Sequence, residues 1–378
     1  MIRLLTIVGA RPQIIKAAAI SRVVRTQFAG QIEEKILHTG QHYDDNMSEV
    51  FFRELGIPSP DYNLHVGSGS HGSQTARIIE GIEHVLLEEA YDGVIVYGDT
   101  NSTLAAAVAA SKIHVPVFHI EAGLRSFNMA MPEEVNRIVC DQLSSVLFTP
   151  TLTGLHNLEA EGFGAIKNRV RFQNGLGQRV VLSGDVMYDN ALYFAPKAEE
   201  KSDIIERLGL KKKQFVLATI HRPANTDNAE NLRSILRALG DIAASGVDVI
   251  FPCHPRTKAK LSVERLEFRE SPHFHLIEPV GFYDIIRLEK EARVVLTDSG
   301  GVQKEAFFYG TPSVILRPET EWVEIVDAGA GILADADYER IMAAYEALNG
   351  REVKFPPLFG DGHASERILR EIVNELTN

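Results

Sequence analysis

Short runs of Val, Ile and Leu recur along the chain, each followed by Gly, Asp, His or Pro and then by a longer segment with helical spacing. Such runs are typical of strands buried on both faces of a parallel sheet, in alternation with helices. The first half predicts a helix at 102–112 and strands at 4–8, 36–38, 93–97, 117–120 and 146–148. The second half predicts strands at 215–220, 248–253, 275–277, 294–297 and 313–316. The pattern therefore predicts an α/β protein with two doubly wound, Rossmann-like parallel sheets.

The connection between the two sheets is predicted at 168–189, where regular periodicity is lost. The predicted domains are therefore 1–180 and 181–361. A final helix is predicted at 365–376, because its apolar residues recur at helical spacing. Periodicity leaves open whether this helix packs on the second domain or crosses back to the first.

Polar and ionisable residues stand directly after nearly every predicted strand. In open α/β sheets, ligands bind beyond the carboxyl ends of the strands, where the loops diverge. The residues at these positions are 9–12, 39–42, 98–100, 121–123, 221–222, 254–256, 298–301 and 317–318. We therefore expect a functional site at these strand ends.

The most specific of these segments is Asp298-Ser299-Gly300-Gly301, which leads from a strand directly into a helix. Two glycines let a phosphate approach the free N–H groups and the positive end of the helix dipole, which predicts a diphosphate site. An isolated Ser-Gly-Gly is also an ordinary turn with a helix N-cap. Arg11 and His221 end strands in different halves and could face one phosphate group, although either alone also fits a surface or capping role.

Carboxylates come from three places in the first domain: Asp99, Glu121 and the pair 133–134. Crowded carboxylates displace each other's pKa values, as proton transfer requires, and Lys16 and Arg137 could balance the charge. The alternative is structural, with Asp99 as a helix cap, Glu121 as a loop anchor and the pair as a partner of a helix dipole.

Composition excludes several classes of protein. The formal net charge is −12 and no long run of Lys or Arg occurs, which argues against nucleic-acid binding. The two cysteines, Cys140 and Cys253, lie far apart, so neither a disulfide framework nor a cysteine zinc site is indicated, and a reducing cytoplasm fits. No apolar run of roughly 18 residues predicts a membrane span. His273 and His275 lack a third ligand with convincing spacing, so no metal is expected.

Several catalytic motifs are missing from the sequence. There is no GxGxxG after the first strand, no GxSxG and no GxxxxGK[ST]. Their absence argues against an NAD enzyme, a serine hydrolase and a P-loop kinase, respectively.

Read in order, the motifs GARPQIIKAA, TGQHYD, GDTNST, HIEAGLRS, MPEEVNR, HRPAN, TDSGGVQKEA and TEWVE span nearly the whole chain. Together they resemble the non-hydrolysing UDP-N-acetylglucosamine 2-epimerases. The resemblance implies a GT-B-like fold with an inter-domain cleft, a UDP-sugar substrate and a homodimer. It also implies that the C-terminal segment, 362–378, returns to the first domain.

The resemblance also assigns roles to individual residues. It gives Asp99, Glu121 and Glu133 acid-base roles, and it places His221 and Arg11 near the diphosphate. The remaining matches bind substrate. The phosphate-binding turn is Ser299, Gly300 and Gly301, and Glu305 matches the carboxylate that binds the ribose. Lys16 and Arg137 match cations that line the cleft.

Two departures from the commoner family pattern concern charge. Gln13 stands where Glu is usual, and Trp322 stands in TEWVE where Arg is usual. The combination of RPQ, RSFNMAMPEE and TEWVE resembles the branch that acts on UDP-2,3-diacetamido-2,3-dideoxy-D-glucuronate for bacterial O-antigen. Loss of a carboxylate near an acidic sugar would relieve repulsion. UDP-N-acetylglucosamine is the alternative substrate.

The resemblance implies a route of elimination and re-addition of UDP, with one carboxylate acting on each face of C2 and no cofactor. Two other functions fit the same UDP-sugar cleft. A GT-B glycosyltransferase would require an acceptor and consume the donor, and a non-catalytic UDP-sugar sensor would show no turnover.

Overall fold

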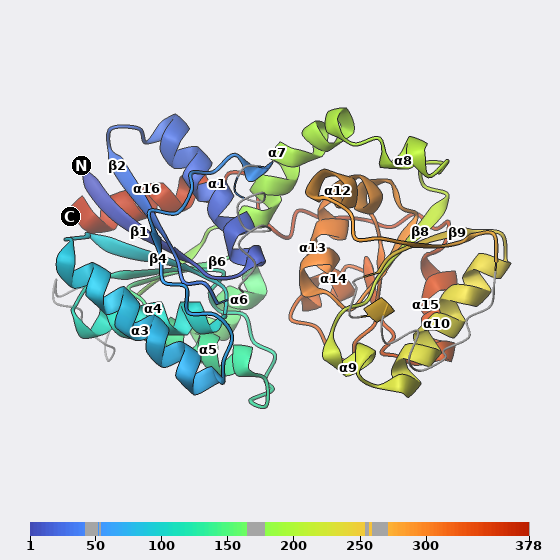
Figure 1. Cartoon of the computed structure of the whole chain (residues 1–378), viewed down its shortest axis with the longest axis horizontal. Helices are drawn as coiled ribbons and strands as arrows, with labels where there is room; N and C mark the ends of the chain where they lie inside the picture. The colour runs from blue at the N-terminus through green and yellow to red at the C-terminus, as the bar shows by residue number, and fades with distance from the viewer. Residues whose placement is uncertain (42–51, 53, 165–177, 254–256, 259–270, 378) are drawn as a thin grey trace. The chain divides into compact units, whose positions relative to one another are not determined.

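The computed structural model describes residues 1–41, 52, 54–164, 178–253, 257–258 and 271–377 (Figure 1). The chain divides into two compact units, Met1–Asn190 with Pro357–Asn378, and Ala191–Pro356. The chain first passes between them within helix α7 (Val186–Lys201). The predicted fold class, with two Rossmann-like parallel sheets, is confirmed.

The first unit contains a parallel sheet in the order β3-β2-β1-β4-β5-β6-β7. The strands are β1 (Ile2–Val8), β2 (Ile32–His38), β3 (Tyr62–Asn63), β4 (Gly93–Tyr97), β5 (Val117–Ile120), β6 (Val146–Thr149) and β7 (Arg179–Leu182). All five residues of β4 and all four of β5 are buried, as expected for central strands covered on both faces. The strand order reverses between β1 and β4, which is where such sheets bind their ligands.

The helices of this unit form a layer on each face of the sheet. Helices α3, α4 and α5 cover one face and α1 and α16 the other (Figure 1). Their bounds are α1 (Arg11–Gln27), α3 (His71–Glu88), α4 (Asn101–Lys112), α5 (Pro132–Leu143), α6 (Leu152–Ala160) and α16 (Ala364–Thr377).

The second unit repeats the same order, β10-β9-β8-β11-β12-β13, again with parallel pairs. Its strands are β8 (Phe215–Thr219), β9 (Asp248–Pro252), β10 (Phe274–Ile277), β11 (Val294–Thr297), β12 (Ser313–Ile315) and β13 (Gly331–Leu333). Its helices are α8 (Ile204–Arg207), α9 (Pro223–Thr226), α10 (Ala229–Ala244), α12 (Phe282–Glu291), α13 (Gly300–Phe308), α14 (Val323–Asp327) and α15 (Tyr338–Leu348).

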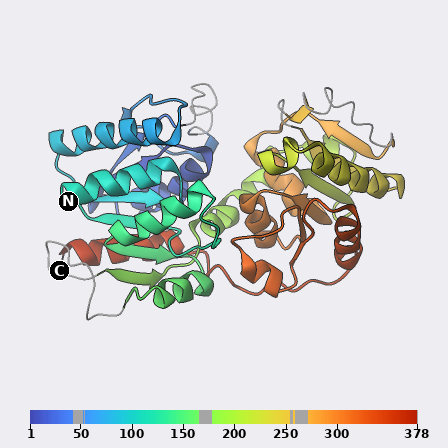
Figure 2. The ribbon, with the colours of Figure 1, turned by 90° about the horizontal axis from the view of Figure 1, so that it is seen from below.

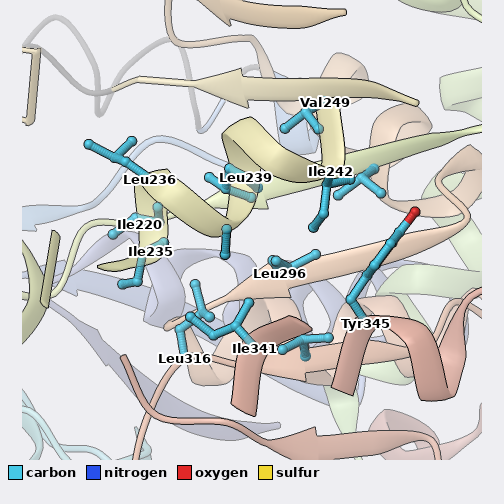
Figure 3. Close-up of a cluster of buried hydrophobic side chains, with 14 of the residues drawn as sticks. Ile220, Ile235, Leu236, Leu239, Ile242, Val249, Leu296, Leu316, Ile341 and Tyr345 are labelled. Carbon is cyan, nitrogen blue, oxygen red and sulfur yellow. The ribbon is translucent and has the colours of Figure 1, made fainter. Parts of the chain in front are cut away.

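The core of the second unit follows from the spacing of apolar residues on its helices. Ile235, Leu239 and Ile242 recur on one side of α10 and are almost fully buried. Figure 3 shows them facing Leu296 of β11 and Ile341 of α15. A separate cluster on the other face of the sheet includes residues of α8, α12 and α13.

The predicted strands at 93–97, 117–120 and 294–297 are confirmed with the same bounds, and the other seven differ only at their ends. The sequence analysis missed β3, β7 and β13, which are short. The described part of the predicted connection, 178–189, contains β7 and the start of α7, and the chain passes to the second unit at Asn190–Ala191.

The final helix belongs to the first unit, which answers the question that periodicity left open (Figure 2). Asp189 accepts hydrogen bonds from the backbone N–H groups of Ala364 and Ser365, the first two residues of α16. Arg179 of β7 pairs with Glu371 and Glu375 farther along the helix. The first unit is therefore completed by the end of the chain.

Gly184 and Gly360 meet where this last segment crosses the end of β7. Both have positive φ, and a Cβ on Gly360 would lie 3.0 Å from the Gly184 Cα atom. Gly360→Ala is expected to destabilise the protein by about 2 kcal/mol or more, because it adds backbone overlap to the cost of left-handed geometry. Gly350→Ala is the matched control, since Gly350 has φ 72° and open space around it. Equal losses in thermal denaturation would contradict this account of the crossing.

Candidate active site

Gln13 is 1% exposed, and its buried side chain supports the loop after β1. Its Oε1 accepts hydrogen bonds from the N–H groups of Gly9 and Ala10, and its Nε2 donates to the carbonyl of Tyr97 at the end of β4. Arg11 begins α1 and is exposed. Gln13 therefore shapes the backbone that presents Arg11, rather than facing a ligand with its own side chain.

Asp99 follows β4 and is held by α5. Arg137 of α5 pairs with both Asp99 and Glu134, and the Asn136 side chain donates to the Asp99 carbonyl at 2.9 Å. The Asp99 side chain remains 26% exposed, whereas that of Arg137 is 5% exposed. The predicted pairing of Arg137 with a carboxylate is thus present, and it leaves Asp99 accessible.

Glu133 and Glu134 are adjacent in the first turn of α5 but have different environments. Glu133 is exposed, whereas Glu134 is buried and accepts hydrogen bonds from the N–H groups of Ser126 and Phe127. Burial opposes the charged form of Glu134, but these bonds and Arg137 outweigh it and lower the pKa of that carboxyl. Glu134 therefore fixes the preceding loop, and Glu133 is the member of the pair that a ligand can reach.

Glu121 follows β5 in left-handed backbone geometry, with φ 70°. Such geometry costs a non-glycine residue about 1–3 kcal/mol and is often found at functional sites. Its carboxylate pairs with Lys16 Nζ at 2.5 Å, and both side chains are about one-tenth exposed. A Cβ built on Gly98 would lie 3.4 Å from the Glu121 Oε1 atom and 3.2 Å from Lys16 Nζ. The pair therefore lies beside the turn that precedes Asp99.

In the second unit, Asp298 joins the ends of β8 and β11. Its buried carboxylate accepts hydrogen bonds from the N–H groups of His221 and Arg222 and lies 3.2 Å from the His221 Nδ1 atom. Burial opposes ionisation of Asp298, but His221 and Arg222 outweigh it and lower the pKa of the carboxyl. The His221 side chain is 56% exposed, so the carboxylate orients an accessible imidazole.

The predicted phosphate turn forms the start of α13. Ser299 is its N-cap and accepts a hydrogen bond from Val302 N, and Gly300 and Gly301 form its first turn, with Gly301 exposed. Unpaired N–H groups at a helix start, where the dipole is positive, favour an anion. Glu305, predicted to bind ribose, lies half-buried one turn later on α13.

A buried ion pair and Trp322 stand beside this turn. Arg317 forms two hydrogen bonds to Glu321, at 2.8 and 2.9 Å. Burial opposes ionisation of Glu321, but Arg317 lowers its pKa to about 2. Trp322 is 4% exposed, and Lys304 Nζ lies 4.0 Å from its ring centroid. Trp322 therefore supports the turn from inside the fold.

The structure groups the sequence-predicted residues by unit. The first unit places Arg11, Lys16, Asp99, Glu121, Glu133 and Arg137 at or beside the carboxyl ends of β1, β4 and β5. The second places His221, Ser299, Gly300, Gly301 and Glu305 at the ends of β8 and β11. His42 and residues 254–256, which also follow predicted strands, lie outside the described residues.

Sequence reasoning assigned no role to Asp298 or to the buried His119, and it interpreted Gln13 as a change of charge near the ligand rather than as the buried support of a loop. Asp298 carried a usable signal, because it stands between a buried strand and the Ser-Gly-Gly turn. His273 and His275 both contact Asp248, a partner that the sequence analysis did not find. Even so, no group of three or more potential ligands in the described part of the chain could hold a metal ion. Within the same residues, no helix is both long and apolar enough to span a bilayer.

Comparison with known proteins identifies the family. Residues 25–373 match the family model described as UDP-N-acetylglucosamine 2-epimerase. The chain is 47% identical over 367 residues to a UDP-2,3-diacetamido-2,3-dideoxy-D-glucuronate 2-epimerase of Pseudomonas aeruginosa PAO1, covering 97% of this chain and 98% of that protein. It is 45% identical over 375 residues to a UDP-N-acetylglucosamine 2-epimerase homolog of Methanococcus maripaludis, covering 98% of this chain and 99% of that protein.

A solved structure gives the same result. The crystal structure of Methanocaldococcus jannaschii UDP-GlcNAc 2-epimerase in complex with UDP-GlcNAc and UDP matches with a TM-score of 0.86 and 39% identity, covering 99% of this chain and all of that one. The chain therefore belongs to the UDP-N-acetylglucosamine 2-epimerase family. It is an isomerase, a UDP-sugar 2-epimerase of the non-hydrolysing type, and the predicted GT-B-like fold class is confirmed.

Proposed function

We propose that this epimerase inverts C2 of UDP-2,3-diacetamido-2,3-dideoxy-D-glucuronate to give the manno isomer. The observation that carries this choice is the 47% identity, over nearly the full length of both chains, to the Pseudomonas protein named for that substrate. The alternative is UDP-N-acetylglucosamine, because relatives named for that sugar are also similar over the full chain. We further propose a homodimer in the cytoplasm that supplies surface polysaccharide synthesis.

The chemistry requires a leaving group, because the C2 proton of such a sugar is not next to a carbonyl. In the proposed reaction, a base removes the C2 proton while the C1–O bond breaks, and its electron pair leaves with UDP. The intermediate is a glycal with a C1–C2 double bond. Protonation of C2 from the opposite face and return of UDP to C1 complete the inversion without a cofactor.

The two units supply different parts of this chemistry in our proposal. Asp99, Glu121 and Glu133 act as acid and base, and general acid-base groups contribute about 10²- to 10⁴-fold each. Asp99 and Glu133 are accessible to solvent, and Glu121 follows β5 directly beside the turn that precedes Asp99. Lys16 pairs with Glu121 and Arg137 pairs with Asp99, which holds these carboxylates in position.

The diphosphate is bound by the second unit together with Arg11. Gly300 and Gly301 offer N–H groups at a helix start beside the Ser299 hydroxyl, and His221 and Arg11 add donors that stabilise the charge on departing UDP. Glu305 binds the ribose. In this proposal, residues of both units bind the same UDP-sugar.

Turnover in deuterated water tests the reaction type. The product is expected to carry one deuterium at C2, since the proton that is returned comes from solvent by way of a side chain. Mass spectrometry and ¹H NMR measure it, with an enzyme-free incubation as the control. Product without deuterium would exclude proton exchange at C2 by elimination and re-addition.

Turnover of the two candidate sugars tests the substrate. We expect a higher kcat/KM with UDP-2,3-diacetamido-2,3-dideoxy-D-glucuronate than with UDP-N-acetylglucosamine, both followed by ¹H NMR of the anomeric signals. A higher kcat/KM with UDP-N-acetylglucosamine would assign the alternative and leave the reaction type unchanged.

A further inference from the structure

A buried polar network lies under the two loops that carry Asp99 and Glu121. His119 is the third residue of β5 and is fully buried. Its Nδ1 atom lies 2.7 Å from the Asp141 carboxylate on α5, and its Nε2 atom lies 2.7 Å from the carbonyl oxygen of Gly98. A fully buried imidazole with acceptors at both nitrogens is fixed in position and in orientation.

The partners of His119 fix the hydrogen on Nε2. A carbonyl oxygen only accepts, so the contact with Gly98 requires an N–H on Nε2. Burial opposes the charged imidazole, but Cys140 and Asp141 outweigh it and raise the pKa of His119. The second nitrogen then also carries a hydrogen and donates it to Asp141. His119 is accordingly a double donor that ties β5 to the end of β4.

The hydrogen bond from His119 Nε2 to the Gly98 carbonyl fixes the turn before Asp99. Gly98 has φ 62°, and both of its backbone polar atoms are bound to β5, since its N–H donates to Ile120 O at 2.9 Å and its carbonyl accepts from His119. The direction of the chain into Asp99 therefore depends on the His119 ring.

The same network acts on the loop after Glu121. The second oxygen of Asp141 accepts a hydrogen bond from Gly123 N at 3.2 Å and pairs with Arg125 at 2.8 Å. Arg125 also binds Glu161. Asp141 thus joins the loop that begins at the strained Glu121 backbone to the ring that holds the Asp99 turn.

We propose that His119, supported by Asp141, is a positioning residue that sets Asp99 and Glu121 at a fixed separation for proton transfer at C2. This inference rests on the proposed function of the two carboxylates. A displacement of about 1 Å at a reacting group can cost on the order of 10²-fold in rate, so a buried link between two acid-base loops has a large effect on kcat.

Two substitutions separate the contacts of His119. In His119→Gln the amide nitrogen takes the place of Nε2, so the bond to Gly98 can persist while the bond to Asp141 is lost. In His119→Asn the amide nitrogen takes the place of Nδ1, so the bond to Asp141 can persist while the bond to Gly98 is lost. Both variants lose the same imidazole ring and its charge. Each variant is therefore the stability control for the other.

We expect His119→Asn to lower kcat about 10²-fold and His119→Gln less than about tenfold, because only the former frees the Asp99 turn. The Kd for UDP should stay within about threefold in both variants, since the proposed diphosphate turn belongs to the second unit. Equal kcat values for the two variants, or a His119→Asn enzyme with wild-type kcat, would overturn the proposal.

A crystal structure of His119→Asn provides a readout that does not depend on activity. Displacement of the Gly98–Asp99 turn supports the proposal, and an unmoved turn contradicts it. If the wild-type enzyme epimerises neither candidate sugar, the proposed substrates fail, while the position of Asp99 in this variant still decides the positioning role.

Discussion

Replacing Glu121 with Gln is expected to lower kcat by about 10²- to 10⁴-fold, the range that a general acid-base group contributes. Gln keeps the shape of the side chain but cannot take or give a proton at the reaction's pH. The backbone should remain in place, because Glu121 N and Ala122 N both donate to the Phe148 carbonyl. The Kd for UDP should change little, since the proposed diphosphate contacts lie elsewhere.

The variant also leaves Lys16 without its carboxylate partner, so a loss of stability has to be separated from a loss of chemistry. Circular dichroism, thermal denaturation and UDP titration on the same preparation make that separation. Glu88→Gln is a surface control, because the Glu88 side chain is 63% exposed on α3. A Glu121→Gln enzyme with kcat within tenfold of wild type would exclude Glu121 as an acid-base group.

Gly301→Asp is expected to raise the Kd for UDP at least about 100-fold, because two unit charges 4 Å apart repel by about 4 kcal/mol at an effective dielectric constant of 20. Folding should be preserved. Among the described residues, the only atom within 4 Å of a Cβ at Gly301 is Ser299 Oγ, at 3.8 Å. Asp is also favoured in the first turn of a helix. Isothermal titration with UDP measures the effect.

Gly281→Asp is the matched control for this substitution. Gly281 is the N-cap of α12 in the same unit, and no atom in the part of the chain that the structure describes lies within 4 Å of a Cβ built on it. The substitution therefore places the same charge at another helix start. UDP affinity should stay at the wild-type value there. Unchanged affinity in Gly301→Asp, or an equal loss in both variants, would contradict a diphosphate site at Ser299–Gly301.

The sequence predicts the central strands well because they are buried on both faces and therefore read as continuous apolar runs. The strand β7 was missed for a physical reason: it begins with Arg179, none of its residues is fully buried, and its pairing with β6 comes from tertiary contacts. β3 is two residues long, too short for any period to show. The same apolar runs also indicate where each strand ends. The candidate site could therefore be predicted, because its residues follow those strand ends.

Side-chain direction is the part that sequence alone does not give. In the sequence, Glu133 and Glu134 are two adjacent and equivalent carboxylates. In helix α5, Glu133 is exposed to solvent, whereas Glu134 is buried and pairs with Arg137. Likewise, His119 stands in an apolar strand with no sign that its ring reaches Asp141, which is 22 residues away. Such contacts depend on how helices pack on the sheet.

The central claim is that the carboxylates of the first unit and the phosphate turn of the second act on one UDP-sugar. A crystal structure of Glu121→Gln with UDP-2,3-diacetamido-2,3-dideoxy-D-glucuronate tests it most directly. We predict the diphosphate on the N–H groups at Ser299–Gly301, with Asp99 and residue 121 within hydrogen-bond reach of the sugar ring, about 2.6–3.2 Å or through one water. A bound ligand whose sugar ring contacts neither residue would contradict the account.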